Sequence, residues 1–155
     1  MPDTTWRKSA GRFGAMILLT DNPEEFLEQW NRPAAPGYKP QLRTTTATRR
    51  GGNVAAIIMF RGCKPDANGN CDAEVDFRLL RPDKTLYGEQ KQAELWKGKP
   101  APPGDYLQVG LGIFGIRVEP DDPFGTYTFE ATVRDRLAKM QVVLTTELRV
   151  EAGGD

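Results

Sequence analysis

The last third of the chain alternates between inward and outward positions with a period of two residues. The inward positions are Tyr127, Phe129, Ala131 and Val133 in a first run and Val142, Leu144, Thr146, Leu148 and Val150 in a second run. A period of two is typical of β strands that have one buried face. The two runs therefore predict a long antiparallel hairpin, and we expect this hairpin to close an all-β sandwich.

Further runs predict the other strands of the sandwich. Residues 13–19 and 54–60 are apolar at nearly every position, as in strands at the centre of a sheet, whereas residues 75–79 alternate. Within residues 107–118, the large apolar residues switch from odd-numbered to even-numbered positions near several glycines. We therefore expect a bulge or bend there. Residues 42–49 are rich in threonine and arginine, which predicts an edge strand protected by charge.

One short helix is predicted over residues 23–31. Asn22 is a favourable cap, Pro23 fits the first helical position, and Glu25 is placed to reach back to the cap. We expect one or two turns of helix over the end of a sheet.

The remaining segments define the domain organisation. The polar residues 1–11 are expected to be a flexible segment, and residues 12–151 to form a single sandwich domain. Residues 88–104 end in a tract of prolines and glycines that does not suit a strand ladder. We therefore expect an irregular surface crossing over residues 88–104.

Charge and hydropathy exclude several classes of partner. The 21 Lys and Arg residues are balanced by 21 Asp and Glu residues, which argues against nucleic acid because phosphate binding needs concentrated positive charge. No apolar run approaches the roughly 20 residues of a membrane span. The residues after Met1 also lack the basic start and apolar stretch of a signal peptide. The protein is expected to be either cytoplasmic or exported with its signal peptide already removed.

The two cysteines favour export. Cys63 and Cys71 flank a loop that contains Asn68 and Gly69, and Asn-Gly is a strong hairpin signal. A hairpin at this point would bring the two sulfur atoms together, and we expect a disulfide. Stable disulfides indicate an oxidising compartment, so we expect a periplasmic or secreted protein. Two free thiols in a cytosolic protein are the alternative.

The sequence contains no histidine. Serine and cysteine nucleophiles activated by histidine are therefore excluded, as are the usual zinc sites. We expect a protein that is not an enzyme and that needs no cofactor. A glycosidase that uses two carboxylates remains as an enzymatic alternative, and it would require a deep cleft.

One acidic loop resembles a calcium ligand pattern. Asp66, Asn68, Asn70 and Asp72 follow a D-x-N-x-N-x-D spacing that could direct several oxygens toward a cation. The pattern departs from a calcium loop, because Cys71 stands where glycine is needed. A disulfide-closed turn explains the same residues without a metal, and we expect no metal site. A second acidic cluster at residues 119–122 is interpreted as a turn between strands.

Aromatic residues and prolines are the candidates for ligand or partner contact. Trp30, Tyr38 and Trp96, together with Pro102 and Pro103, could line a groove for a peptide or a sugar. The alternative is that these residues cap the open ends of the core.

The C-terminal region resembles the closing hairpin of bacterial immunoglobulin-like and macroglobulin-like modules. The resemblance lies in a Pro-x-Gly-x-Tyr turn, Pro123-Phe124-Gly125-Thr126-Tyr127, that leads into a strand ending in Val133-Arg134-Asp135. The whole chain is also similar to small secreted bacterial proteins with a short cysteine-closed loop. These resemblances imply an immunoglobulin-like antiparallel β-sandwich, and they bring no catalytic residues with them.

Together these observations predict a non-enzymatic exported β-sandwich. We expect it to act as a protein-interaction or structural module of the bacterial cell envelope, with an unknown protein partner. The alternative is a small-ligand or carbohydrate-binding module that uses the loop aromatics.

Overall fold

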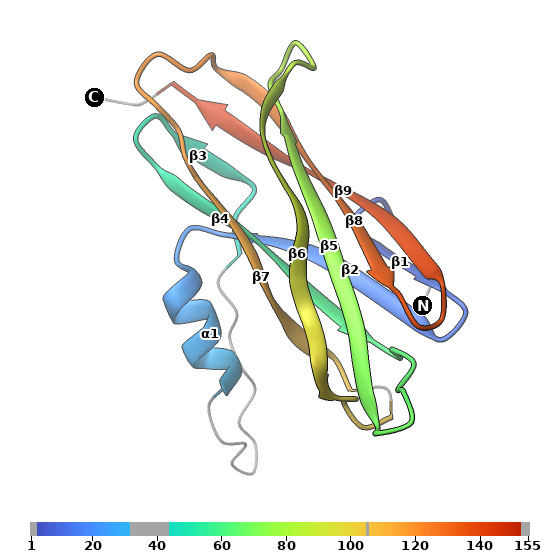
Figure 1. Ribbon diagram of the computed structural model, residues 1–155. Coiled ribbons are helices and arrows are strands. Elements are labelled where there is room, and N and C mark those ends of the chain that lie inside the picture. The colour runs from blue at the N-terminus through green and yellow to red at the C-terminus, as the bar shows by residue number, and fades with distance from the viewer. Residues whose placement is uncertain (1–2, 32–43, 105, 153–155) are drawn as a thin grey trace.

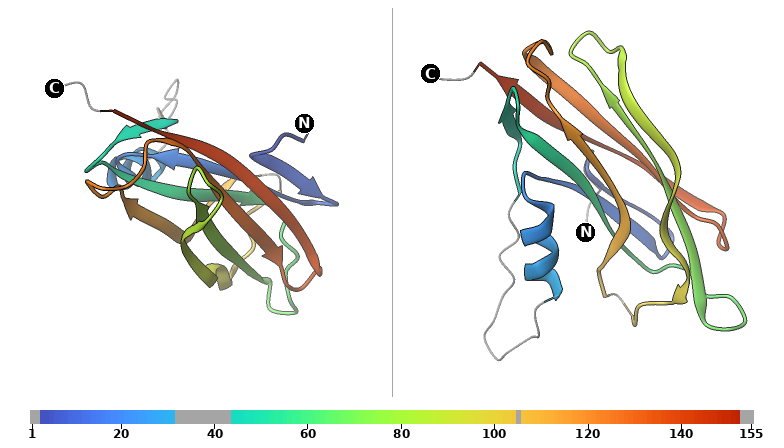
Figure 2. Two further views of the ribbon diagram at one scale, coloured as in Figure 1. Left: turned by 90° about the horizontal axis from the view of Figure 1, so that it is seen from above. Right: turned by 60° about the vertical axis from the view of Figure 1, so that its left-hand side comes forward.

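The computed structural model describes residues 3–31, 44–104 and 106–152, which form two β-sheets packed face to face and a helix (Figures 1 and 2). In chain order, the elements are β1 (Arg7–Ala10), β2 (Phe13–Thr20), α1 (Pro23–Asn31), β3 (Ala47–Arg49), β4 (Asn53–Arg61), β5 (Asn70–Leu80), β6 (Leu86–Pro100), β7 (Gln108–Arg117), β8 (Gly125–Asp135) and β9 (Met140–Glu151). The predicted all-β sandwich is confirmed.

The two sheets differ in size and in strand direction. The four-stranded sheet has the order β1-β2-β4-β7 and is antiparallel throughout. The five-stranded sheet has the order β3-β9-β8-β5-β6, and all of its pairs are antiparallel except β3 with β9. The predicted C-terminal hairpin is the pair β8–β9, and the predicted edge strand is the short β3, although residues 42–43 lie outside the described residues.

Aromatic side chains fill the space between the sheets. Phe77 of β5 stacks on Phe114 of β7 at a centroid distance of 5.5 Å, and Phe129 of β8 meets Phe114 edge-on at 6.2 Å. Phe77 and Phe129 are fully buried. Complete burial of such a side chain contributes about 1.5–3 kcal/mol, so this core is the main source of stability.

A second apolar cluster covers the outer face of the four-stranded sheet. Phe26 of α1 packs there against Ile57, Met59 and Val109, all of which are buried. The helix has the predicted bounds, but it lies on this outer face instead of the end of a sheet. Its presence explains why β2 and β4 are apolar on both sides.

The helix cap matches its prediction. The Oδ1 atom of Asn22 accepts a hydrogen bond from the backbone N–H of Glu25 at 3.1 Å. The Glu25 carboxylate in turn accepts a bond from the Asn22 side-chain amide at 3.3 Å. This exchange satisfies one of the free backbone donors at the start of α1.

The first strand corrects the expectation of a flexible segment before Arg12. Residues Arg7–Ala10 pair with β2 through a hairpin in which Ala10 faces Phe13. The polar residues of β1 are accommodated because the strand is an edge strand, which has only one neighbour in the sheet.

The expectation of an irregular crossing over residues 88–104 was also wrong for most of its length. β6 continues to Pro100 and pairs with β5, and its irregularities are absorbed as four shifts of register. Gln92 and Gly98 have positive φ angles of 54° and 63°. Ala93 and Leu95 are buried and attach this edge strand to the core.

The bulge expected among the glycines of β7 is confirmed. The register between β4 and β7 shifts between Ile57 and Met59. A Cβ atom on Gly110 would collide with the side chain of Leu95, which reaches β7 from the other sheet. Glycine at this position therefore allows the edges of the two sheets to approach each other.

Candidate binding cavity

Four connections between strands meet at one end of the sandwich, toward the lower right of Figure 1. They are the β1–β2 turn, the β4–β5 loop that carries the cysteines, the β6–β7 loop and the β8–β9 turn. A cavity of about 510 Å³ lies among them, and we call it the mouth cavity. Its lining residues are Ala10, Arg12, Phe13, Gly62, Cys63, Lys64, Pro65, Ala101, Pro102, Gly104, Asp135, Ala138 and Met140. Three other hollows measure about 100, 300 and 340 Å³, and each is smaller.

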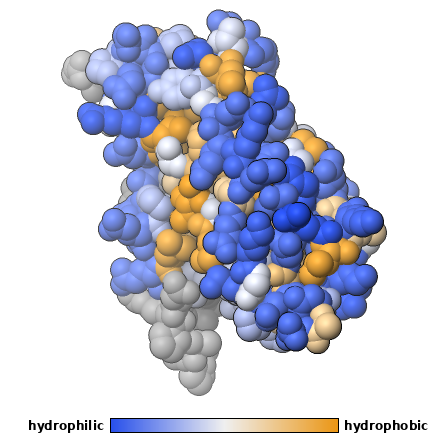
Figure 3. Space-filling model, in the orientation of Figure 1, coloured by the Kyte–Doolittle hydropathy of each residue, from blue (hydrophilic) through white to orange (hydrophobic). Residues whose placement is uncertain are grey.

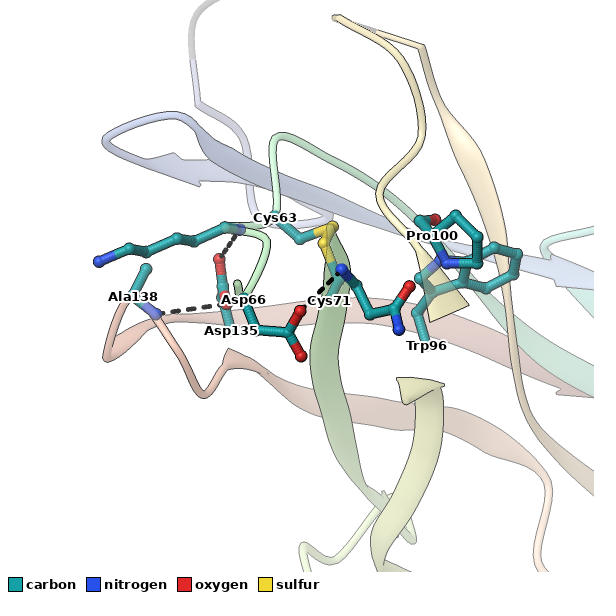
Figure 4. Close-up of a disulfide and its surroundings, with 9 residues drawn as sticks. Cys63, Asp66, Cys71, Trp96, Pro100, Asp135 and Ala138 are labelled. Atoms are coloured by element: carbon teal, nitrogen blue, oxygen red, sulfur yellow. Dashed lines mark hydrogen bonds between the residues drawn. A yellow bond between two sulfur atoms is a disulfide. The ribbon is translucent and has the colours of Figure 1, made fainter. Parts of the chain in front are cut away.

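The predicted disulfide forms one wall of this cavity. Cys63 and Cys71 are bonded, with 6.0 Å between their Cα atoms, and both are buried (Figure 4). The loop between them is not a hairpin of paired strands, however, because β4 and β5 belong to different sheets. The disulfide therefore fixes a crossing from one sheet to the other.

A polar turn closes the tip of the same loop. The Oδ1 atom of Asp66 accepts the backbone N–H groups of Asn68 at 2.8 Å and of Asn70 at 3.0 Å. Beyond the loop, the N–H of Ala101 donates to the carbonyl of Gly69 at 3.0 Å. The tip is thus bonded both to itself and to the β6–β7 loop.

Asp135 joins two of the four connections. It is 1% exposed, and its Oδ2 atom accepts the backbone N–H of Lys64 at 2.8 Å. Its Oδ1 atom accepts the N–H of Ala138 at 3.4 Å (Figure 4). Sequence reasoning did not identify this residue as part of a site. The sequence did contain a signal for it. Asp135 lies two residues after Val133, so it continues the inward-facing positions of β8 and places a carboxylate at one of them.

Two glycines bring the β1–β2 turn against the disulfide loop. Gly11 has a φ of 60° at the first position of a two-residue hairpin loop, which fits a type II′ turn. Gly62 has a φ of 71°, and a Cβ atom there would collide with the carbonyl oxygen of Arg12. These glycines hold the exposed residue Arg12 at the rim of the cavity.

Of the four predicted contact residues that the structure describes, Pro102 alone lines the mouth cavity. Pro103 is exposed and its carbonyl accepts the N–H of Tyr106 at 3.0 Å, while Tyr38 lies outside the described residues. Trp96 is half-buried in the main core beside Phe60, with 5.9 Å between the rings.

The two tryptophans do not form a common groove. The indole N–H of Trp96 donates to the carbonyl of Pro100 at 2.9 Å (Figure 4). Trp30 instead belongs to the outer cluster, 6.1 Å from the ring of Tyr106. The four-stranded sheet therefore separates Trp30 from Trp96.

The two acidic patterns serve local structure. Asp66 caps its own turn as described above, and Asp72 lies 3.6 Å from the guanidinium of Arg136. In the second cluster, the Asp122 carboxylate accepts the N–H of Glu119 at 2.7 Å and the hydroxyl of Tyr87 at 2.6 Å. Within the described ranges, no group of three or more His, Cys, Asp or Glu residues could hold a metal ion.

The opposite end of the sandwich is closed by a tyrosine corner. The hydroxyl of buried Tyr127 donates to the carbonyl of Pro123 at 2.7 Å. This bond lies inside the Pro-x-Gly-x-Tyr turn, where Gly125 has a φ of 130°. A tyrosine corner of this kind fastens a turn to the following strand.

An ion-pair network lies on the outer face of the five-stranded sheet. Arg134 contacts Asp76 at 2.8 Å and Glu74 at 3.1 Å. The hydrogen bond from Arg134 lowers the pKa of Asp76 below its ordinary value, since it favours the charged carboxylate. Figure 3 shows this polar character over β5 and β6, whereas apolar side chains gather in a band over β7 beside α1.

The protein is similar to solved structures in fold, although its sequence matches little. The sequence matches no protein-family model and no curated protein. A solved Niemann-Pick type C2 protein from the Japanese carpenter ant is 8% identical, covers 87% of this chain and 89% of its own, and has a TM-score of 0.47. A family 123 glycoside hydrolase from Clostridium perfringens is 8% identical with a TM-score of 0.45, and the match covers 92% of this chain but 28% of the hydrolase.

Neither similarity indicates a function for this chain, because both TM-scores are low. The resemblance of the C-terminal region to bacterial immunoglobulin-like and macroglobulin-like modules stays a prediction. Among the described residues, no helix has the length and apolar character needed to cross a membrane.

Proposed function

We propose that the protein is a binding module that holds a small ligand in the mouth cavity and performs no chemistry on it. The observation that carries this proposal is the convergence of four connections around a cavity of about 510 Å³. Small-molecule sites typically measure about 300–1,000 Å³ and have apolar walls with a few polar groups. The lining of the mouth cavity has this composition.

The bonds between the connections also support binding. The disulfide, the two hydrogen bonds of Asp135 and the bond from Ala101 to Gly69 hold the cavity walls without a ligand. A wall that is already ordered does not have to lose conformational freedom when the ligand arrives. Rigid loops on a sandwich scaffold are also where binding residues are commonly found.

This conclusion favours the second of the two functions expected from the sequence, but at other residues. The cavity is lined by Pro102 and the disulfide and not by the tryptophans. Catalysis is not part of the proposal, because the sequence has no histidine and, among the residues that the structure describes, Asp135 is the only carboxylate in the cavity lining. A glycosidase would need a second carboxylate facing the first.

A protein partner is a second candidate for the same end of the molecule. Leu137 and Met140 in and beside the β8–β9 turn are 38% and 41% exposed, and such apolar side chains suit a protein interface. We place the module in an oxidising compartment, the bacterial periplasm or the exterior, on the strength of its disulfide.

The binding test uses two fluorescent probes with the same aromatic body, anilinonaphthalene sulfonate and its neutral parent phenylnaphthylamine. At least one probe should bind the wild-type protein with increased emission. Ala138→Phe should abolish this binding by filling the cavity, whereas Ala67→Phe should not, because Ala67 is exposed and does not line the cavity.

A second blocking variant controls for the case in which the first variant does not fold. Pro102→Trp fills the cavity from the β6–β7 loop, and thermal unfolding shows which variants are folded. The proposal fails if neither probe binds the wild-type protein. It also fails if folded blocking variants bind both probes as well as the wild-type protein does.

A further inference from the structure

We infer that the ligand of the mouth cavity is a small organic anion, with an apolar body on the cavity floor and its anionic group between Arg12 and Lys64. This inference rests on the proposed function and adds the chemical class of the ligand. Both cations line the cavity from different connections, the β1–β2 turn and the disulfide loop.

Within the part of the chain that the structure describes, the side chains of these two cations have no ion-pair partner. Neither Arg12 nor Lys64 forms an ion pair with any carboxylate in the described ranges. The chain as a whole has equal numbers of acidic and basic residues. Positive charge that is left unpaired beside a cavity favours a negatively charged group of the ligand.

The carboxylate of Asp135 in the cavity lining already has its hydrogen-bond partners. Both oxygen atoms of Asp135 accept backbone N–H groups, those of Lys64 and Ala138. Asp135 is also 1% exposed, so it offers little surface to a cationic ligand. Nearby Arg136 lies 3.6 Å from Asp72 and 3.8 Å from Glu74, and it does not line the cavity.

Most of the cavity lining is apolar. Ala138, Met140 and half-buried Pro102 expose apolar surface to the cavity, while Phe13 and Cys63, which also line it, are almost fully buried. These groups suit an aliphatic or aromatic body. A bare inorganic anion would leave them uncovered.

The shape of Arg12 adds specificity. Its turn is fixed by Gly11 and by the close approach of Gly62, so the start of its side chain is held in place. A guanidinium presents a planar fork of donors that pairs with two oxygen atoms of a carboxylate, sulfonate or phosphate. Lys64 adds a point charge without demanding the same geometry.

The test compares the affinities of the two probes named above, whose only difference is the sulfonate. The wild-type protein should bind anilinonaphthalene sulfonate more tightly than phenylnaphthylamine. The double variant Arg12→Gln/Lys64→Gln should bind the sulfonate probe roughly five- to tenfold less tightly, as expected for the loss of two exposed charges. Its affinity for the neutral probe should be unchanged. Lys84→Gln, at the opposite end in the β5–β6 turn, is the control for losing a positive charge away from the cavity, and each single variant, Arg12→Gln and Lys64→Gln, is compared with it.

Salt dependence gives a second readout. Raising the ionic strength from about 0.01 M to 0.15 M shortens the screening length from about 30 Å to about 8 Å, so only the sulfonate probe should bind less tightly. Competition by octanoate and by octyl phosphate then shows which anion the site prefers. Displacement by either supports the inference.

The possible failures can be told apart. If neither probe binds, or if folded Ala138→Phe and Pro102→Trp bind both probes normally, the proposed function and this inference fall together. If the probes bind in the cavity with equal affinity, or if the double variant leaves the sulfonate probe unaffected, the binding module stands and the anionic ligand is refuted. Tighter binding of the neutral probe refutes it as well.

Discussion

Replacing Asp135 with alanine should destabilise the protein strongly, although the residue lies at the end of a strand. Its carboxylate accepts N–H groups from Lys64 at 2.8 Å and from Ala138 at 3.4 Å, in a position that is 1% exposed. Hydrogen bonds to a charged group are worth about 1.5–3 kcal/mol each, and the longer of these two is expected to contribute less. We therefore expect the free energy of unfolding to fall by about 2–4 kcal/mol.

The size of the chain converts this loss into a melting temperature. For a protein of about 150 residues, each kcal/mol lowers Tm by about 2–4 °C, so Asp135→Ala should unfold roughly 5–15 °C below wild type. Asp135→Asn keeps one acceptor but turns an amide donor toward one of the N–H groups. The free energy of unfolding should fall about half as far in Asp135→Asn as in Asp135→Ala.

Urea unfolding of oxidised protein, followed by tryptophan fluorescence, measures both variants. Asp121→Ala is the matched control, because Asp121 is exposed at the opposite end of the sandwich, and it should change stability by less than about 0.5 kcal/mol. The reasoning is refuted if Asp135→Ala is as stable as this control. It is also refuted if the asparagine variant is no more stable than the alanine variant.

Three other changes test other parts of the fold. Tyr127→Phe removes the hydroxyl of the tyrosine corner and should cost about 1 kcal/mol in urea unfolding. Gly110→Ala should cost about 1–3 kcal/mol by overpacking, and the cost should shrink when it is measured in a Leu95→Ala background, which provides the missing space. The pKa of Asp76 is lowered in the folded state, so the stability that it provides is present above its unfolded pKa of about 3.9 and is lost as the pH falls below about 4. Arg134→Gln should flatten this part of the stability profile measured between neutral and acidic pH.

Hydrophobic periodicity predicted the strands whose side chains divide cleanly between core and solvent. The alternation in β8 and β9 and the continuous apolar run in β4 both follow directly from burial on one or two faces. β1 and β6 were missed because both are edge strands, where few side chains are buried and polar residues are tolerated. For β1, the local signal was Gly11 between Ala10 and Phe13, which is favourable in a type II′ hairpin turn.

The candidate site was less predictable than the fold. The Cys63–Cys71 pair could be expected because the two residues are close in sequence and flank a turn. Arg12 and Lys64 come from two separate connections and Asp135 from the end of β8, and only the packing of the two sheets brings them to one end. No pattern of neighbouring residues in the sequence predicts that these three side chains lie at the same end of the sandwich.

The parallel contact between β3 and β9 affects how the chain folds during its synthesis. It joins Ala47 to Arg149, residues about 100 positions apart, and contacts of such long range are associated with folding over milliseconds to seconds. At a translation rate of about 5–20 residues per second, β3 leaves the ribosome roughly 5–20 s before its partner strand. The five-stranded sheet can be completed only after that delay, so its edge remains open to chaperones for many seconds.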